Sequence, residues 1–275
     1  MIYVSRRPAP PLDAAVSAVW YFRSAPRPFG FERVLPKGRA QLVVNLREDR
    51  TRTYDERGGC LEAPGAVVSG LGPRFEIIDT DEQEHVVGAV FRPGGTTGFF
   101  GDSAYAMRGR DVPLEALWGV TGTALLREAL LEAATPQAAL DVMEHALRQA
   151  RRGRGTHPAV AFALARFHRQ PEVARVGAVT SAIGMSAKRF TERFKAEVGL
   201  TPKQYCRLLR FQQAVSAAHA DTAPDWRDVA LACGYFDQAH FIHDFREFSG
   251  LTPGGYRSGR TVFPNHVTFL QSPAS

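Results

Sequence analysis

Residues 184–194 read Gly-Met-Ser-Ala-Lys-Arg-Phe-Thr-Glu-Arg-Phe, and residues 234–245 read Gly-Tyr-Phe-Asp-Gln-Ala-His-Phe-Ile-His-Asp-Phe. Each stretch contains the pattern Phe-x-x-x-Phe and is followed by Gly-Leu-Thr-Pro-x-x-Tyr, at 199–205 and 250–256. The second copy carries one additional residue after its first glycine. A motif that recurs in one register indicates an internal structural repeat.

Each copy has the pattern of two short helices joined by a tight turn. Apolar residues at 8, 5 and 1 positions before the first glycine lie on one face of a helix. The glycine supplies a left-handed turn that other residues adopt only at a cost. Ser186 and Asp237 are suitable N-caps for the following helix, and the paired phenylalanines form its inward face. We therefore predict two helix-turn-helix units, at about 173–198 and about 226–249.

These residues resemble the C-terminal DNA-binding domain of the AraC/XylS family of transcription regulators, over about residues 157–258. The most specific parts are Asp-Gln-Ala-His-Phe at 237–241 and the final Gly-Leu-Thr-Pro-x-x-Tyr. The resemblance implies seven helices, in which a linker helix from about Pro202 to His219 holds the two units at a fixed separation. It also implies a transcription regulator, activator or repressor, without catalytic residues or enzyme activity. The competing interpretation is a helical repeat with no role in DNA binding.

Basic residues are concentrated in the same part of the chain. The 275 residues carry a formal net charge of +6, and residues 151–260 hold 17 Lys and Arg against 9 Asp and Glu, so the remainder is slightly acidic. A local excess of positive charge favours a polyanionic partner through phosphate contacts and counterion release. An ordinary solvated basic surface is the alternative interpretation of the charge alone.

The character of the chain changes near residue 153. Short runs rich in β-branched residues, separated by Gly- and Pro-containing turns, fill most of residues 1–100 and predict a small sandwich or barrel. Two helices are expected after this region. The first is one amphipathic helix that begins near Leu114 and carries Leu117, Val120, Leu125, Leu126, Leu130 and Leu131. The second is expected to begin at Pro136. We therefore predict an α+β protein: a β-rich N-terminal sensor or dimerisation domain with trailing helices at 1–150, a linker at 151–156, an all-α domain with two helix-turn-helix units at 157–260, and a tail at 261–275.

In a helix-turn-helix, the second helix enters the major groove with its N-terminal, outward residues facing base edges. Glutamine can pair with adenine, lysine can donate to guanine, and glutamate can accept from cytosine. Outward position and the resemblance together indicate base reading by Lys188, Thr191 and Glu192 in the first unit and by Gln238, Ala239, His240, Ile242 and His243 in the second. Phosphate contacts are expected from Ser186, Arg189, Arg193, Lys195 and Arg246. Two helices meeting successive grooves about 34 Å apart would let one chain read an asymmetric site.

Several of these residues have a second interpretation. Glu192 can form a surface ion pair with Arg189 or Lys188 instead of reading a base. His243 can contact a phosphate, which would make binding depend on pH. Thr180 stands where the family usually has a small apolar residue, so the first unit can pack differently. For the basic side chains, the alternative is an ordinary solvated surface.

Other chemistry has weaker support. Cys233, His240 and His243 are zinc-ligand types, but Cys233 lies in the apolar register of its helix and a fourth ligand is missing, so no metal is predicted. Residues 92–98 are Gly-rich but lack the phosphate-loop pattern, and no cofactor is expected. Six aromatic residues can belong to the core or line an apolar ligand pocket: Trp20, Tyr21, Phe22, Phe29, Phe31 and Trp118.

Two functions from different classes fit the sequence. The favoured one is a cytoplasmic, sequence-specific transcription regulator. Its expected partner is double-stranded DNA, with RNA polymerase, a small-molecule effector and a second copy in a homodimer as further candidates, and with no membrane partner. Three cysteines and the lack of a signal-like or membrane-length apolar run fit the cytosol. The alternative is a small-molecule-binding or enzymatic β-domain whose helical half mediates protein contacts, and the basic charge of that half argues against it.

Overall fold

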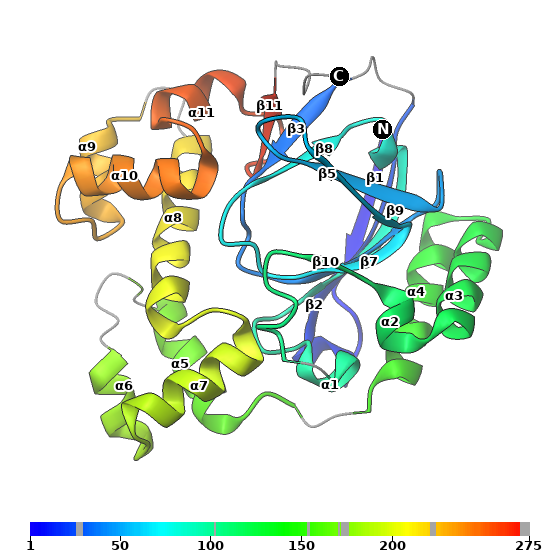
Figure 1. Cartoon of the computed structure of the whole chain (residues 1–275), viewed down its shortest axis with the longest axis horizontal. Helices are drawn as coiled ribbons and strands as arrows, with labels where there is room; N and C mark the ends of the chain where they lie inside the picture. The colour runs from blue at the N-terminus through cyan, green and yellow to red at the C-terminus, as the bar shows by residue number, and fades with distance from the viewer. Residues whose placement is uncertain are drawn as a thin grey trace.

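The computed structural model describes residues 1–25, 30–101, 103–152, 155–169, 171, 176–220 and 224–269. A β-rich N-terminal part is followed by an all-helical part (Figure 1), so the predicted α+β class is confirmed. Among the described residues, no helix has both the length and the apolar character needed to cross a bilayer. Phe29, residues 153–154, residues 173–175 and residues 270–275, for which the sequence made predictions, lie outside these ranges.

Two antiparallel sheets form the N-terminal part. The first sheet has the strand order β1 (Ile2–Arg6), β2 (Val16–Arg23), β9 (His85–Phe91), β4 (Gln41–Asn45), β7 (Ala66–Ser69) and β10 (Asp111–Pro113). The second has the order β11 (His266–Phe269), β3 (Phe31–Val34), β8 (Glu76–Asp79), β5 (Arg50–Tyr54) and β6 (Cys60–Pro64). Three short helical turns complete this part: η1 (Leu12–Ala14), η2 (Glu82–Glu84) and α1 (Thr97–Phe100). The strand β11 comes from the predicted tail, which therefore returns to the N-terminal part and pairs with β3.

The first sheet has two different faces, because successive side chains of a strand point to opposite sides. Along β2, Val19 and Tyr21 join a buried apolar cluster, whereas Trp20 and Phe22 line a cavity between the two sheets. The sequence did not decide which aromatic residues belong to the core and which line a pocket. Tyr21 and Phe31 are buried in the core. Trp20 and Phe22 belong to the cavity wall, and Trp118 stacks on Phe100 instead.

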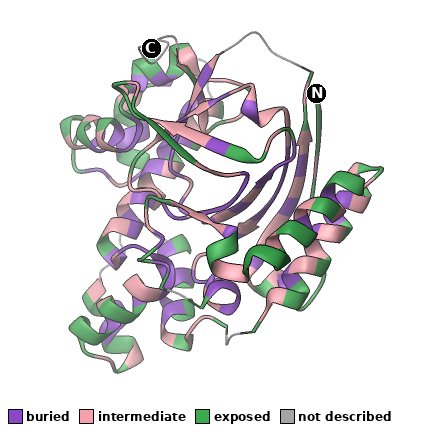
Figure 2. Ribbon diagram, turned by 45° about the vertical axis from the view of Figure 1, so that its right-hand side comes forward, coloured by how far each residue is buried: buried purple, intermediate pink, exposed green. Residues whose placement is uncertain are grey.

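Three helices cover the outer face of the first sheet (Figures 1 and 2). They are α2 (Leu114–Trp118), α3 (Val120–Glu132) and α4 (Pro136–Ala150). The predicted start of α4 is confirmed, since Pro136 occupies the first turn and Thr135 caps it. The single helix expected from Leu114 is wrong: Gly119, with φ of +82°, separates α2 from α3. Only part of the predicted apolar stripe is buried, because Leu126 and Leu130 face the sheet while Val120, Leu125 and Leu131 are exposed.

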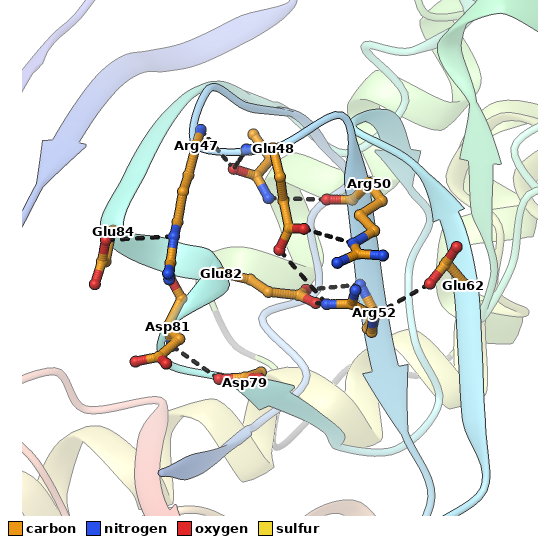
Figure 3. A network of polar contacts seen from close by, with 10 residues as sticks. Arg47, Glu48, Arg50, Arg52, Glu62, Asp79, Asp81, Glu82 and Glu84 are labelled. Carbon is orange, nitrogen blue, oxygen red and sulfur yellow. Dashed lines mark hydrogen bonds and ion pairs between the residues drawn. The ribbon is translucent and has the colours of Figure 1, made fainter. Parts of the chain in front are cut away.

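A network of arginines and carboxylates joins the start of β5 and the loop before it to η2, the turn before β9 (Figure 3). Arg52 binds the buried carboxylate of Glu82 and also lies 3.2 Å from Glu62 Oε2. The backbone amide of Arg52 donates to the other oxygen of Glu82, at 2.8 Å. Glu82 is thus buried with its charge compensated, which is the usual condition for burying a carboxylate.

The described residues of the C-terminal part form seven helices. They are α5 (Pro158–Arg169), α6 (Val176–Ile183), α7 (Ala187–Val198), α8 (Pro202–Ala220), α9 (Trp226–Ala232), α10 (Gln238–Ser249) and α11 (Pro253–Gly259). The four phenylalanines of the repeated motif are fully buried, as predicted: Phe190, Phe194, Phe241 and Phe245. They contact one another and the tyrosines that end the two Gly-Leu-Thr-Pro motifs, Tyr205 and Tyr256, at ring-centroid distances of 5.6 to 5.8 Å.

Candidate nucleic-acid interface

Each half of the helical part contains two helices joined by the turn that the sequence predicts. Gly184 ends α6 with φ of +63°, and Gly234 follows α9 with φ of +72°, so both use the left-handed region open to glycine. The hydroxyl of Ser186 accepts from the Arg189 amide at 3.4 Å, and the Asp237 carboxylate accepts from the His240 amide at 2.7 Å. The predicted caps are therefore present at the start of α7 and of α10.

The long helix α8 connects the two units. Figure 1 shows α6 and α7 at one end of α8 and α9 and α10 at the other. Its residues Tyr205, Leu208 and Phe211 are fully buried among the helices of both units, in one continuous apolar cluster. This shared core makes the two second helices, α7 and α10, parts of one body.

The first turns of α7 and α10 present polar side chains to solvent. Lys188 and Glu192 are exposed and Thr191 is half-buried on α7, while Gln238, Ala239 and His243 are exposed on α10. His240 and Ile242 are half-buried. The ring of His240 contacts Tyr235 edge-on, and Ile242 packs against the apolar cluster, so both are less available than their neighbours.

The five predicted phosphate-contact residues have different surroundings. Arg189 and Arg246 are exposed, and Arg193 is exposed with a loose 3.8 Å contact to Glu197. The ammonium group of Lys195 lies 3.5 Å from the centre of the Tyr105 ring, which belongs to the N-terminal part. Ser186 uses its hydroxyl for the helix cap. Among the predicted phosphate-contact residues, Arg189 and Arg246 are therefore the basic side chains with the least contact with the rest of the protein.

The geometry bears on two alternatives raised by the sequence. Glu192 has no ion pair with Lys188 or Arg189, all three being described residues. Thr180 is buried, and its hydroxyl donates to the Gly177 carbonyl at 3.0 Å, so its polar group is satisfied within α6.

Arg207 of α8 anchors the second unit. One of its terminal nitrogens lies 2.6 Å from Asp244 Oδ1 and 2.6 Å from Glu247 Oε2, and Asp244 is 1% exposed. Hydrogen bonds to these carboxylates raise the pKa of Arg207, and its guanidinium compensates the charge of the buried Asp244. Within the described residues, His243, Asp244 and Glu247 are close enough to surround a metal ion, but Arg207 already engages both carboxylates. Cys233 is not part of this group and lies in the core.

The N-terminal part contacts the C-terminal ends of both α7 and α10, which the sequence did not predict. The Ala196 carbonyl of α7 accepts from the Ala104 amide at 2.8 Å. On α10, the Phe248 carbonyl accepts from the Phe75 amide at 2.9 Å, and the Ser249 carbonyl accepts from Arg33 at 2.8 Å. The donors come from three separate segments, so only folding brings them together.

Comparisons with known proteins agree with this architecture. Residues 179–259 match a family described as a helix-turn-helix domain, and residues 5–113 match one described as Domain of unknown function (DUF6597). The chain is 31% identical over 86 residues to the HTH-type transcriptional activator RhaS of Escherichia coli. That similarity spans only 31% of each of the two chains.

Two solved structures illustrate the structural similarity. The C-terminal domain of AraT, a response regulator from Geobacillus stearothermophilus, is 20% identical and covers 39% of this chain and 90% of its own, with a TM-score of 0.36. ToxT from Vibrio cholerae is 10% identical and covers 94% of this chain and 98% of its own, with a TM-score of 0.46.

Two helix-turn-helix units on one connecting helix define a double helix-turn-helix protein. The match over residues 179–259 and the similarity to RhaS confirm the resemblance of its C-terminal domain to the AraC/XylS family of transcription regulators.

Proposed function

We propose that this protein is a sequence-specific transcription regulator that inserts α7 and α10 into successive major grooves of one DNA duplex. The observation that carries the proposal is the pair of capped helix-turn-helix units built into one core with α8. Each unit offers exposed side chains from the first turns of its second helix. A rigid pair of unlike helices suits an asymmetric site, because the two halves carry different side chains.

The proposed base readers differ in chemistry between the units. In the first, Lys188 is suited to guanine and Glu192 to the cytosine amino group, with Thr191 beside them. In the second, Gln238 is suited to bidentate pairing with adenine, and His243 offers a second polar contact. Ala239 and Ile242 are suited to apolar contact with thymine methyl groups, and His240 lies at the edge of this set.

The proposed phosphate contacts come mainly from the exposed arginines. Arg189 and Arg246 are exposed on α7 and α10, so they can meet the backbone on either side of each groove. Arg193 adds positive charge next to them, and Lys195 and Ser186 contribute less because each already has a protein partner. Such contacts give affinity without sequence preference.

The N-terminal part is proposed to control DNA binding. Its contacts with the ends of α7 and α10 give it a direct mechanical connection to both proposed reading helices. A small-molecule effector that shifts these contacts would change how well the two helices match their grooves. Homodimer formation and contact with RNA polymerase belong to the same proposal, as means by which a bound regulator acts on transcription.

Selection of binding sites from a random duplex pool by the full chain tests the proposal. We expect one asymmetric consensus with two half-sites separated by about one helical turn. The combined variant Lys188→Ala, Thr191→Ala and Gln238→Ala should lose the consensus, whereas Gln137→Ala, an exposed change on α4, should retain it. Specific binding that survives the triple substitution would refute the assignment of readers, and binding without any sequence preference would refute the function.

A further inference from the structure

A cavity of about 830 Å³ lies between the two sheets of the N-terminal part. Its volume is within the range of pockets that hold drug-sized ligands, roughly 300–1,000 Å³. The first sheet contributes Trp20 and Phe22, the second contributes Glu76 and Ile78, and α8 contributes one face that includes Leu209. The helix that connects the two helix-turn-helix units is therefore also a wall of this cavity.

Two carboxylates from opposite sheets line the cavity. Glu76 lies on β8 and Asp111 on β10, and Asp111 interacts with the Ser69 hydroxyl. Glu76 is half-buried, and its carboxylate has neither a hydrogen bond nor an ion pair among the described residues. Burial raises the pKa of both carboxyls, and the charge of Asp111 further raises that of Glu76. The protein thus holds two acidic groups together without giving Glu76 a direct partner.

Lys37, the lysine of the cavity wall, is not a direct partner of Glu76. The Lys37 ammonium lies 3.4 Å from Nε2 of His266, whose Nδ1 lies 2.8 Å from the Glu32 carboxylate. Lys37 therefore belongs to a chain of contacts with His266 and Glu32, and it acts on Glu76 only from beyond ion-pair distance. The cavity wall carries two cationic side chains, Lys37 and Arg39, against the three carboxylates of Glu32, Glu76 and Asp111, so its net charge is −1 when all three carboxylates are ionised.

Other parts of the wall are apolar and include two aromatic rings. Trp20 and Phe22 stand on the cavity side of β2, with Val90 on the adjacent strand β9 and Val43 on β4 beyond it. Gly88 makes room for the indole ring, because a Cβ atom at this position would lie 2.5 Å from Trp20. Aromatic faces attract cations as well as apolar groups.

We propose that this cavity binds an organic cation, whose protonated amine lies between Glu76 and Asp111 and whose aromatic body packs on Trp20 and Phe22. Charge-assisted hydrogen bonds from the amine would supply the missing partner of Glu76. The site also connects to the proposed DNA-reading helices, because the residue before Glu76 is Phe75, whose amide binds the end of α10. That regulatory consequence rests on the proposed function, whereas the binding itself does not.

Three indole compounds that differ in their terminal group test the charge preference: tryptamine, tryptophol and indole-3-propionate. Each is titrated calorimetrically into the full chain at about pH 8, where the amine is protonated and the pH lies above the pKa of about 7 of Glu76. We expect tryptamine to bind about tenfold or more tightly than tryptophol, and indole-3-propionate to bind most weakly. Tighter binding of the propionate, equal binding of all three, or no binding of any of them would overturn the proposal.

Two variants locate the amine. Glu76→Gln combined with Asp111→Asn should abolish the preference for tryptamine over tryptophol and leave tryptophol affinity unchanged. Glu62→Gln, which removes an exposed carboxylate of β6 outside the cavity, should leave both affinities unchanged. A tryptamine affinity that persists in the double variant would overturn the proposal. Tryptamine binding by a chain that fails to select a DNA consensus would refute only the proposed function.

Discussion

The backbone amide of Phe75 donates to the carbonyl of Phe248 across 2.9 Å, which joins the strand side of the molecule to the end of α10. The Arg33 guanidinium lies 4.1 Å from the centre of the Phe75 ring and donates to the next carbonyl, that of Ser249. The Ala104 amide makes the corresponding contact with Ala196 of α7. Because one β-rich body fastens the ends of both helices, a change within that body can alter their relative position.

Substitution of Gly250 measures the strength of this joint. Gly250 follows α10 with φ of +68°, and a Cβ atom there would lie 2.3 Å from Arg33 and 2.5 Å from the Phe75 ring. Gly184 has φ of +63° but no atom within 4 Å of such a Cβ, so it is a matched control. Gly184→Ala should cost about 1–2 kcal/mol for the left-handed backbone, and Gly250→Ala should cost distinctly more in chemical denaturation. Equal losses of unfolding free energy would mean that the contact contributes little.

Removal of Arg207 should strongly destabilise the second helix-turn-helix unit. Arg207→Met leaves the buried Asp244 carboxylate without its cation, a change that typically costs about 3–5 kcal/mol of unfolding free energy. Arg166→Met, at an exposed position of α5, should cost less than about 0.5 kcal/mol. Adding Asp244→Asn to Arg207→Met should restore part of the loss, and the absence of any restoration would contradict the explanation that Arg207 compensates the charge of Asp244.

Stability should depend on pH through Glu76. Burial and the neighbouring charge of Asp111, opposed by Lys37, raise the pKa of Glu76 from 4.5 to about 7. The folded state then binds more protons than the unfolded state between these values, so stability falls as pH rises through this window. Glu76→Gln should therefore raise the melting temperature more at about pH 8 than at about pH 5. The control Glu62→Gln should show no such pH dependence, and an equal response of the two variants would reject the explanation.

Salt dependence separates the proposed phosphate contacts from the proposed base readers. The change of Arg189 or Arg246 to glutamine should reduce the slope of log affinity against log salt by about 1 each and weaken binding to all duplexes alike. Gln238→Ala should leave the slope unchanged and cost about 1–3 kcal/mol at the cognate site, with relaxed preference at one base pair. Fluorescence anisotropy at several salt concentrations measures both quantities. An unchanged slope in both arginine variants would show that those side chains do not contact phosphate.

Local patterns in the chain predicted the helical part well. The turn glycines, the caps at Ser186 and Asp237 and the buried phenylalanine pairs all depend on residues within four positions of one another. The same kind of reasoning was wrong for the helix near Leu114, where Gly119 interrupts the pattern and leaves Leu125 exposed. Amphipathic spacing indicates a helix but does not say how much of its apolar stripe a neighbouring element covers.

The amino-acid order alone therefore determined the twin helix-turn-helix units and their family, because a helix, its cap and its turn are specified by neighbours in the chain. Tertiary structure decided which aromatic residues of β2 face the cavity, since that choice depends on where the second sheet lies. It also brought Glu76 next to Asp111 and Phe75 next to Phe248, pairs that are distant in the chain. Such contacts arise from the packing of whole sheets and helices, and no local pattern encodes them.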